Sequence, residues 1–227
     1  MPAHGPIVAI DGRSGAGKST VARGVAQRLG FRHVDTGAMY RSVALAALRR
    51  NVDLADAEAL GRLAASLAIE IHPEATDDRV LLDGEDVTQA IRTPEVSAAA
   101  SLVSTAPGVR AVLVARQRTL VAGGRLVMEG RDIGTVVLPH AEVKVFLDAS
   151  VEARAARRHA ELRSRGVRVD LEEVRRQEAE RDRRDETRTI SPLRSAADAV
   201  IIDTTGRTAD AIIDEIVRLV RERTGVV

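Results

Sequence analysis

The fold of this chain is decided by residues 7–30, IVAIDGRSGAGKSTVARGVAQRLG. Residues 7–10 are apolar and mostly β-branched, which is typical of a strand buried on both faces of a parallel sheet. A glycine-rich stretch follows, and apolar residues then return every four positions from Val21 to Leu29 before Gly30. This spacing predicts a helix that ends at a glycine. The segment therefore predicts a strand, a glycine loop and a helix in that order.

Residues 12–19, GRSGAGKS, match the phosphate-loop pattern GxxxxGK[ST]. Glycines let successive backbone N–H groups turn toward phosphate oxygens, and the following helix adds its positive N-terminal end. The Lys18 ammonium is expected to reach the β and γ phosphates, and the Ser19 hydroxyl to hold Mg²⁺. A flexible loop with a solvated lysine is the alternative, but the strand and helix around it are the context that the motif requires. The residues expected to bind the nucleotide are Gly12, Arg13, Ser14, Gly15, Ala16, Gly17, Lys18, Ser19 and Thr20.

The rest of the chain alternates apolar strands with helical segments. Further strands are predicted at residues 31–34, 126–128, 143–147 and 199–202. Helices are predicted after Thr36, which we expect to act as a cap, over 56–68, from 93 to before Pro107, from there to Gly123, and at the C-terminus. Within residues 69–89 the turn signal Asp83-Gly84 predicts a small antiparallel hairpin. Together these elements predict an α/β fold of three layers with a five-stranded parallel sheet.

Composition and charge describe an ordinary globular protein. Of 227 residues, 44% are apolar and 30% are charged, and the 34 basic residues nearly balance the 33 acidic ones. Neither nucleic acid nor a membrane is therefore expected as a partner, and aromatic residues are too scarce to stack bases. No apolar run has the length of a membrane span or a secretory signal. The absence of cysteine excludes disulfides and fits a cytoplasmic location.

A phosphate loop alone does not separate a kinase from a GTPase switch or a motor. No guanine-reading NKxD-like stretch is present, and Lys144 is the only lysine beyond the loop. Three other segments are rich in arginine and carboxylates, namely DTGAMYR at 35–41, GRDIGTVV at 130–137 and ERDRRDETR at 180–188. Each follows a predicted strand or lies on a covering helix, so each can reach the crevice over the phosphate loop.

With these motifs in this order, the chain resembles the bacterial cytidylate kinase family of nucleoside monophosphate kinases, from the loop to Asp203. The resemblance implies that ATP, with Mg²⁺, donates a phosphoryl group to CMP or dCMP. It also implies a single domain, with a core of residues 5–35, 106–153 and 189–227, a monophosphate-binding region at 36–105, and a lid with its following helix at 154–188. The implied acceptor site consists of Thr36, Tyr40, Arg41, Ser101, Arg110, Arg131, Asp132, Arg181, Asp185 and Arg188.

The resemblance further implies roles for these residues. The expected catalytic residues are Lys18, Arg131, Arg158 and Arg188. Arg154 and Arg158 are similar to the RxxxR of the family's lid, and Arg154 is expected to bind ATP. Asp185 is the candidate for the ribose hydroxyls, and the acceptor phosphate is assigned to Arg41, Arg131 and Arg188.

The residues themselves support part of this assignment. Arg131 and Asp132 directly follow the strand at 126–128, where an arginine can clamp a phosphate, although an ion pair in a turn is the alternative. Arg181, Asp185 and Arg188 are spaced four and three apart and share a helix face, although such runs are more often solvated.

The cytosine edge offers an amino donor and two acceptors, which the Asp132 carboxylate with Ser101, and the Arg110 guanidinium, would match. A surface hydroxyl and a solvated arginine are the alternatives for Ser101 and Arg110. In uracil, two of these positions exchange donor for acceptor. A buried site built for one base would therefore leave polar groups unpaired with the other base.

Two other functions remain open. A sister kinase acting on UMP, AMP or another small phosphate or hydroxyl acceptor would carry a similar loop and similar lid arginines. A nucleotide-dependent regulatory protein would bind ATP without an acceptor site. Glu129 stands where relatives often place aspartate. A water-mediated role near Mg²⁺ and simple capping are both open for it, and we leave it out of the catalytic set. The expected partners are small-molecule nucleotides alone, and we expect a monomer.

Overall fold

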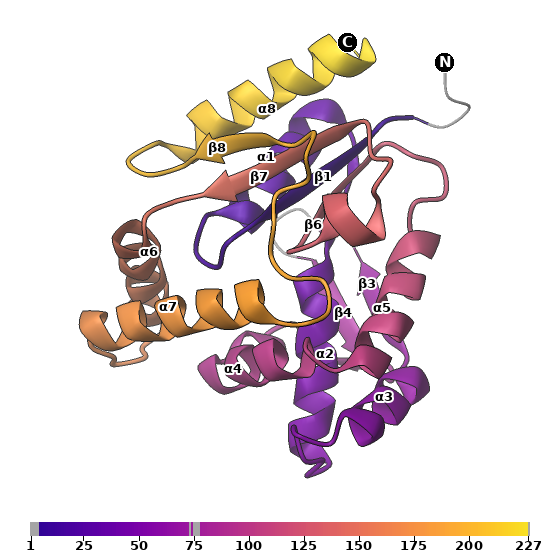
Figure 1. The fold of residues 1–227 in the computed structure, drawn as a ribbon, viewed down its shortest axis with the longest axis vertical. Coiled ribbons are helices and arrows are strands. Elements are labelled where there is room, and N and C mark those ends of the chain that lie inside the picture. The colour runs from indigo at the N-terminus through magenta and orange to yellow at the C-terminus, as the bar shows by residue number, and fades with distance from the viewer. Residues whose placement is uncertain (1–4, 73, 75–77, 227) are drawn as a thin grey trace. The chain divides into compact units, whose positions relative to one another are not determined.

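Figure 1 shows the computed structural model of the protein, which describes residues 5–72, 74 and 78–226. The chain divides into two compact units, one of Met1–His33 with Gly123–Val227 and one of Val34–Ala122. The hairpin expected within 69–89 includes residues 73 and 75–77, which lie outside the described residues.

The first unit is built on a five-stranded sheet with the strand order β2-β6-β1-β7-β8. The central strand β1 (Ile7–Gly12) pairs in parallel with β6 (Leu126–Glu129) and β7 (Val143–Asp148), and β7 pairs in parallel with β8 (Val200–Asp203). β2 (Arg32–Asp35) is the edge strand beside β6. The predicted α/β fold with a five-stranded parallel sheet is confirmed.

Helices α1 (Lys18–Leu29) and α8 (Ala209–Thr224) pack against each other and against the sheet (Figure 1). Their shared core is aliphatic, with Val8 and Ile10 of β1, Val25 of α1 and Ile216 of α8 all 0% exposed. Every residue of β1 after Ile7 is buried, which explains why residues 7–10 are apolar rather than alternating.

Helices α6 (Val151–Ser164) and α7 (Leu171–Thr187) occupy the region predicted as the lid and its following helix. They pack through a small apolar cluster of Ala155, Leu162 and Val174. Ser150 caps α6 and Asp170 caps α7, each with a side-chain oxygen that accepts backbone N–H bonds. The segment after β6 forms one short π-helical turn, η2 (Ile133–Val137).

The second unit combines helices with a small antiparallel sheet. Helix α2 (Thr36–Arg49) packs against α4 (Pro94–Val103), and α3 (Ala57–Ser66) packs against α5 (Pro107–Thr119). Strands β3 (Ile69–His72), β4 (Arg79–Leu82) and β5 (Glu85–Asp86) pair antiparallel, and a short 3₁₀ turn, η1 (Ala90–Arg92), precedes α4. The predicted hairpin at Asp83-Gly84 is confirmed, because these two residues connect β4 to β5 with positive φ angles.

One expected helix cap differs from the structure. Asp35, rather than Thr36, caps α2, because its Oδ1 accepts the N–H of Ala38 at 3.3 Å and Thr36 is already helical. The implied division into a core, a monophosphate-binding region and a lid stays a prediction, and helix α5 lies in the second unit. There Arg116 donates hydrogen bonds to carbonyl oxygens at the end of α3, those of Leu67 at 2.9 Å and Ala65 at 3.2 Å.

Across the described ranges, no single helix is both long and apolar enough to cross a membrane. The bent pair of α4 and α5, whose axes differ by 99°, meets that length and composition only when the two helices are taken together.

Candidate active site

The phosphate loop joins β1 to α1, and its shape depends on glycine at two positions. A Cβ on Gly12, which has a φ of 150°, would lie 2.1 Å from the carbonyl oxygen of Leu147. A Cβ on Gly15, which has a φ of 70°, would lie 2.9 Å from Cβ of Arg154. A side chain at either position would therefore collide with β7 or α6, so glycine is what allows the loop to lie this close to both elements.

Lys18 begins α1 and is only 8% exposed. Its Nζ donates to the carbonyl oxygen of Arg13 at 2.6 Å, so the side chain folds back over the loop. Burial and the nearby charges of Arg131 and Arg181 lower the pKa of Lys18 to about 7. An anion bound next to this ammonium would relieve the repulsion from both guanidinium groups. The electrostatics therefore favour a phosphate at this position.

Arg154 of α6 contacts the backbone of the phosphate loop. The residue is 3% exposed, and it donates from Nε to the carbonyl oxygen of Ala149 at 2.9 Å and from Nη1 to that of Ser14 at 3.3 Å. Its Nη2 lies 2.6 Å from Oδ2 of Asp182 in α7, and Nη1 lies 3.8 Å from Oε2 of Glu178. These contacts position the loop. The expected contact of Arg154 with ATP stays a prediction.

Arg157, one turn further along α6, was not predicted as a site residue. Its Nη1 donates to the carbonyl oxygen of Gly15 at 3.4 Å, and its Nη2 donates to the carbonyl oxygen of Thr204 at 2.6 Å. The Thr204 hydroxyl in turn donates to the carbonyl oxygen of Ala16 at 3.2 Å. Side chains of α6 and Thr204 thus satisfy the carbonyl oxygens of three consecutive loop residues, Ser14, Gly15 and Ala16.

Arg13, the second residue of the loop, forms ion pairs with two elements. Its Nε lies 3.0 Å from Oδ1 of Asp148 at the end of β7, its Nη1 lies 3.4 Å from Oδ2 of Asp182, and Nη1 also pairs with Glu186. Burial raises the pKa of Asp182, although the charges of Arg154 and Arg13 oppose this shift. One network of ion pairs therefore joins the loop, α6 and α7.

Ser19 is exposed in the first turn of α1, and its hydroxyl donates to Oε2 of Glu129 at 3.0 Å. Glu129 ends β6 and is only 2% exposed. Mg²⁺ prefers oxygen ligands and usually takes only one or two from the protein, so this hydroxyl and carboxylate fit the ion. Sequence reasoning left Glu129 out, yet the structure places it against the predicted metal ligand.

Asp11, near the end of β1, organises the segment that follows β6. Its two carboxylate oxygens accept the backbone N–H groups of Ile133 and Gly134, each at 2.7 Å. Burial raises the pKa of Asp11 to about 6, although these two hydrogen bonds lower it. The same segment carries Arg131 and Asp132, so Asp11 fixes the backbone that directly follows both residues.

Asp185 of α7 lies within a cluster of three arginines. It is 4% exposed, and its Oδ2 lies 3.1 Å from Nε of Arg131. Burial alone would raise the pKa of Asp185, but the charges of Arg131, Arg181 and Arg188 hold it below its usual value. The structure thus brings these four predicted residues together. Because Arg131 and Arg181 also act on the pKa of Lys18, the cluster borders the phosphate loop.

The second unit contains the remaining predicted acceptor residues. Arg110 of α5 is 4% exposed, and its guanidinium carbon lies 5.9 Å from the ring centroid of Tyr40 in α2. This distance allows a cation–π contact. Ser101 of α4 is also 4% exposed, so neither Ser101 nor Arg110 is the solvated side chain that the alternative interpretation required.

Thr36 and Arg41 lie at the start of α2 in the same unit. Thr36 is 3% exposed, and Arg41 donates from Nη2 to Oδ2 of Asp35 at 2.7 Å. The cap of α2 therefore also orients Arg41. Their contacts with an acceptor stay predictions.

The structure does not bring every predicted residue into the cluster. Arg158 donates to Glu161 of its own helix at 2.8 Å, and its catalytic role stays a prediction. Asp132 is 5% exposed, and its charge contributes to the raised pKa of Asp11. Thr20 is exposed on α1, and its contact with the nucleotide also stays a prediction.

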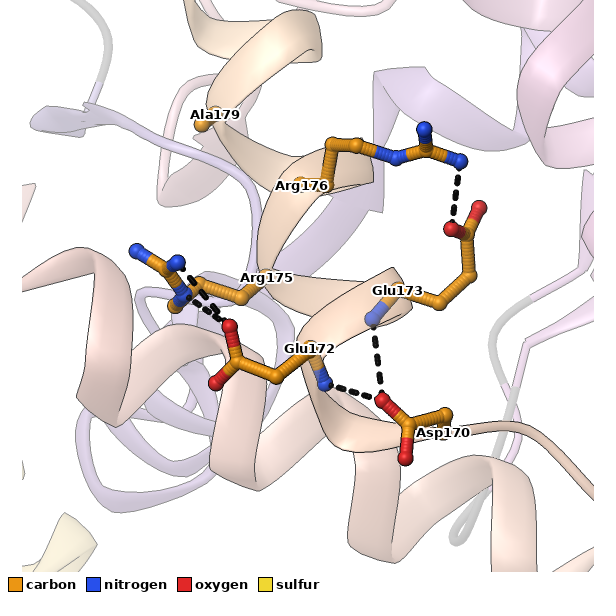
Figure 2. Close-up of a pocket in the computed structure, with 6 residues that line it drawn as sticks. All are labelled: Asp170, Glu172, Glu173, Arg175, Arg176 and Ala179. Atoms are coloured by element: carbon orange, nitrogen blue, oxygen red, sulfur yellow. Dashed lines mark hydrogen bonds and ion pairs between the residues drawn. The ribbon is translucent and has the colours of Figure 1, made fainter.

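A separate surface pocket lies at the start of α7 (Figure 2). Its lining consists of Asp170, Glu172, Glu173, Arg175, Arg176 and Ala179. Figure 2 shows Glu172 paired with Arg175 and Glu173 paired with Arg176, each three residues apart on an exposed helix face. Such pairs are typical of solvated helices, so the pocket adds nothing to the site.

Comparison with known proteins identifies the family of the chain. The model of the family described as cytidylate kinase matches residues 8–222. The cytidylate kinase of Pelotomaculum thermopropionicum is 54% identical over 213 residues, which cover 93% of this chain and 94% of that protein. The cytidylate kinase of Geobacillus kaustophilus is 50% identical over 218 residues, covering 96% and 97%. A bifunctional pantoate ligase/cytidylate kinase of Synechococcus sp. is 52% identical over 96% of this chain and 41% of that longer protein.

Among solved structures, an uncharacterized protein from Eubacterium ventriosum has a TM-score of 0.53 at 11% identity, covering 96% of this chain and 99% of that one. That likeness concerns the fold alone. The family model and the relatives at 50% identity or more extend over nearly the whole chain, which confirms the resemblance seen in the motifs. The chain belongs to the cytidylate kinase family.

Proposed function

We propose that this chain transfers the γ-phosphoryl group of ATP to the phosphate of CMP or dCMP, giving ADP and CDP or dCDP. The observation that carries this proposal is the cluster of Arg131, Arg181 and Arg188 around Asp185, which borders the loop lysine. Direct transfer between two phosphorylated ligands requires two adjacent cationic sites. The names of the relatives support a cytosine nucleotide as the acceptor.

The loop is the donor site. Its backbone N–H groups and Lys18 would hold the phosphates of ATP, while Arg154 and Arg157 keep the loop carbonyls turned toward α6. Ser19 and Glu129 would hold Mg²⁺. When bound, the ion neutralises negative charge on the phosphate oxygens of ATP.

The arginine cluster is the acceptor-phosphate site. Arginine remains charged at every physiological pH and presents a fork of N–H donors that matches phosphate oxygens. Asp185 holds Arg131 in place through its hydrogen bond at 3.1 Å, and its second oxygen is the candidate partner for a ribose hydroxyl. The cluster is therefore organised before the acceptor arrives.

The chemistry needs positioning more than proton transfer. An oxygen of the acceptor phosphate, already an anion, forms a bond to the γ phosphorus while the bond between that phosphorus and the bridging oxygen of ADP breaks. No general base is required. The guanidinium groups and Lys18 stabilise the negative charge that spreads over the transferred group.

For base recognition we propose Ser101 and Arg110 of the second unit, with Asp132 assisting. A buried hydroxyl and a buried guanidinium discriminate strongly, because a base with the wrong pattern leaves them unpaired.

A panel of acceptors tests the assignment. ADP formation from ATP and Mg²⁺ is measured with CMP, dCMP, UMP and AMP. CMP or dCMP should exceed UMP and AMP in kcat/KM by about 10⁴-fold, the scale of polar discrimination in a buried site. Faster turnover of UMP or AMP would instead favour a sister kinase. ATP binding without acceptor-dependent ADP formation would favour a nucleotide-dependent regulatory protein.

A further inference from the structure

His33 is a buried histidine that the proposed function does not use. It lies in β2, next to β6 in the sheet, and 5% of its side chain is exposed. Its Nε2 lies 3.1 Å from Oε1 of Glu129, and the other oxygen of Glu129 accepts the Ser19 hydroxyl at 3.0 Å. A continuous chain of hydrogen bonds therefore runs from β2 through β6 to the phosphate loop.

The chemistry of the groups sets the direction of these bonds. A carboxylate can only accept, so Nε2 of His33 carries a hydrogen and donates it to Glu129, and the Ser19 hydroxyl donates as well. Each oxygen of the carboxylate thus has its own donor. The Ser19 oxygen keeps its lone pairs, which are what a cation binds.

Glu129 needs this restraint because its side chain is long. Glutamate has one more rotatable bond than aspartate, so more conformational entropy is lost when its carboxylate is held in one place. Glu129 is buried, with 3% of its side chain exposed, and is held at one oxygen by the loop and at the other by His33. Removing His33 would remove the contact that holds Oε1 of the carboxylate.

We propose that His33 is a positioning residue, which holds Glu129 and through it the Ser19 hydroxyl in the orientation that receives the Mg²⁺ accompanying ATP. This inference rests on the proposed function, since it concerns the ion that ATP brings. Groups that hydrogen-bond to metal ligands set metal affinity by orienting those ligands. His33 therefore acts on the metal dependence of ATP binding and leaves the binding of metal-free ATP unchanged.

Calorimetric titration with ATP, at saturating Mg²⁺ and in EDTA, tests this role in the full chain. The ratio of the two dissociation constants measures how much the metal contributes. His33→Leu should reduce this ratio about tenfold without changing the affinity measured in EDTA. His33→Gln keeps an N–H donor and should retain most of the ratio. An unchanged ratio in His33→Leu, an equal loss in both variants, or a parallel loss in EDTA would overturn the proposal.

Two further variants separate positioning from packing. Phe31→Leu is the matched packing control, because Phe31 is buried at 8% exposure and has no polar side-chain atom. Phe31→Leu should lower the Tm but keep the ratio of the dissociation constants for ATP in EDTA and in Mg²⁺. In Glu129→Asp the shorter side chain cannot contact Ser19 and His33 together, so adding His33→Leu should cause no further loss. A further loss of about tenfold in that background would show that His33 does not act through Glu129.

The same titrations distinguish this inference from the proposed function. If the unmodified chain binds no ATP, or binds it equally with and without Mg²⁺, the proposed function fails and the inference fails with it. If the unmodified chain shows the metal dependence and forms CDP, but His33→Leu keeps the same ratio, only the inference fails.

Discussion

Arg154 of α6 and Asp182 of α7 form a buried ion pair, with Nη2 of the arginine 2.6 Å from Oδ2 of the aspartate. Arg154 also donates to the carbonyl oxygen of Ser14, so the pair connects α7 to the phosphate loop. Helix α7 carries Arg181 and Asp185 one residue before and three residues after Asp182. The helix that positions the acceptor arginines is therefore tied to the loop that holds the donor.

Asp182→Asn should destabilise the protein and weaken ATP binding. The substitution keeps the side-chain volume but removes the negative charge that faces two arginines, Arg154 and Arg13. Breaking a buried pair on one side typically costs ~3 kcal/mol. Urea unfolding gives this cost, and calorimetry gives the ATP affinity. Glu172→Gln, an exposed carboxylate of the same helix paired with Arg175, is the matched control and should cost at most about 0.5 kcal/mol. Equal effects of the two variants would remove Asp182 from this role.

Arg131→Ala should abolish most turnover while ATP binding survives. The variant removes a guanidinium group from the acceptor cluster, and the loss of one such electrostatic contact costs ~10³-fold in kcat. Steady-state kinetics measures the turnover, and calorimetry checks ATP. Arg175→Ala, an exposed arginine on α7, should behave as the unmodified protein does. Activity retained in Arg131→Ala would exclude this residue from the site.

Lys18 should take up a proton when Mg²⁺-bound ATP binds. In the protein without ligand, burial and the charge of Arg131 lower the pKa of Lys18 to about 7. At about pH 8 the Lys18 side chain is therefore mostly neutral. The polyphosphate of ATP favours the charged form of Lys18 and raises the pKa of this side chain, so ATP binding takes up protons. The affinity for ATP should therefore fall as the pH rises above about 7. Titrations at about pH 8 in buffers of different ionisation enthalpy measure the uptake. Proton release, or equal uptake by Lys18→Met, would contradict this assignment.

Arg110→Met should raise the KM for CMP and relax the preference for cytosine, with little change in ATP affinity. Arg110 is buried next to Tyr40, and methionine retains much of the apolar stem while removing the donors. The loss of a charged hydrogen bond in a buried site costs ~2 kcal/mol, or roughly 30-fold in kcat/KM. Arg118→Met, on the exposed side of the same helix, is the control. A CMP to UMP ratio that stays unchanged in Arg110→Met would show that this residue does not read the base.

Local patterns were enough to predict most of the fold. The buried strand β1 appears in the sequence as the apolar run 7–10, and the Asp83-Gly84 turn requires no tertiary information. The first residue of α2 could not be assigned this way, because Asp35 and Thr36 are adjacent and both residue types can cap a helix. The place of α5 depends on its contacts with α3, which a sequence pattern does not specify.

In the candidate site, too, local patterns could be predicted from the sequence and long-range contacts could not. The phosphate loop and the spacing of Arg181, Asp185 and Arg188 are local patterns, so both could be found in the sequence. The contacts of Glu129 could not, because its hydrogen-bond partners Ser19 and His33 lie 110 and 96 residues away. The same holds for Arg157, which reaches Gly15 across 142 residues. Only the folded chain shows that these residues share a site.

The identity of the reaction product tests the central claim most directly. Phosphorus NMR of a mixture of the protein, ATP, Mg²⁺ and CMP follows each phosphorus atom as the reaction proceeds. The proposal predicts that CDP and ADP appear together in equal amounts, without inorganic phosphate. Release of inorganic phosphate in place of CDP, or ATP that remains intact in the presence of CMP, would contradict it.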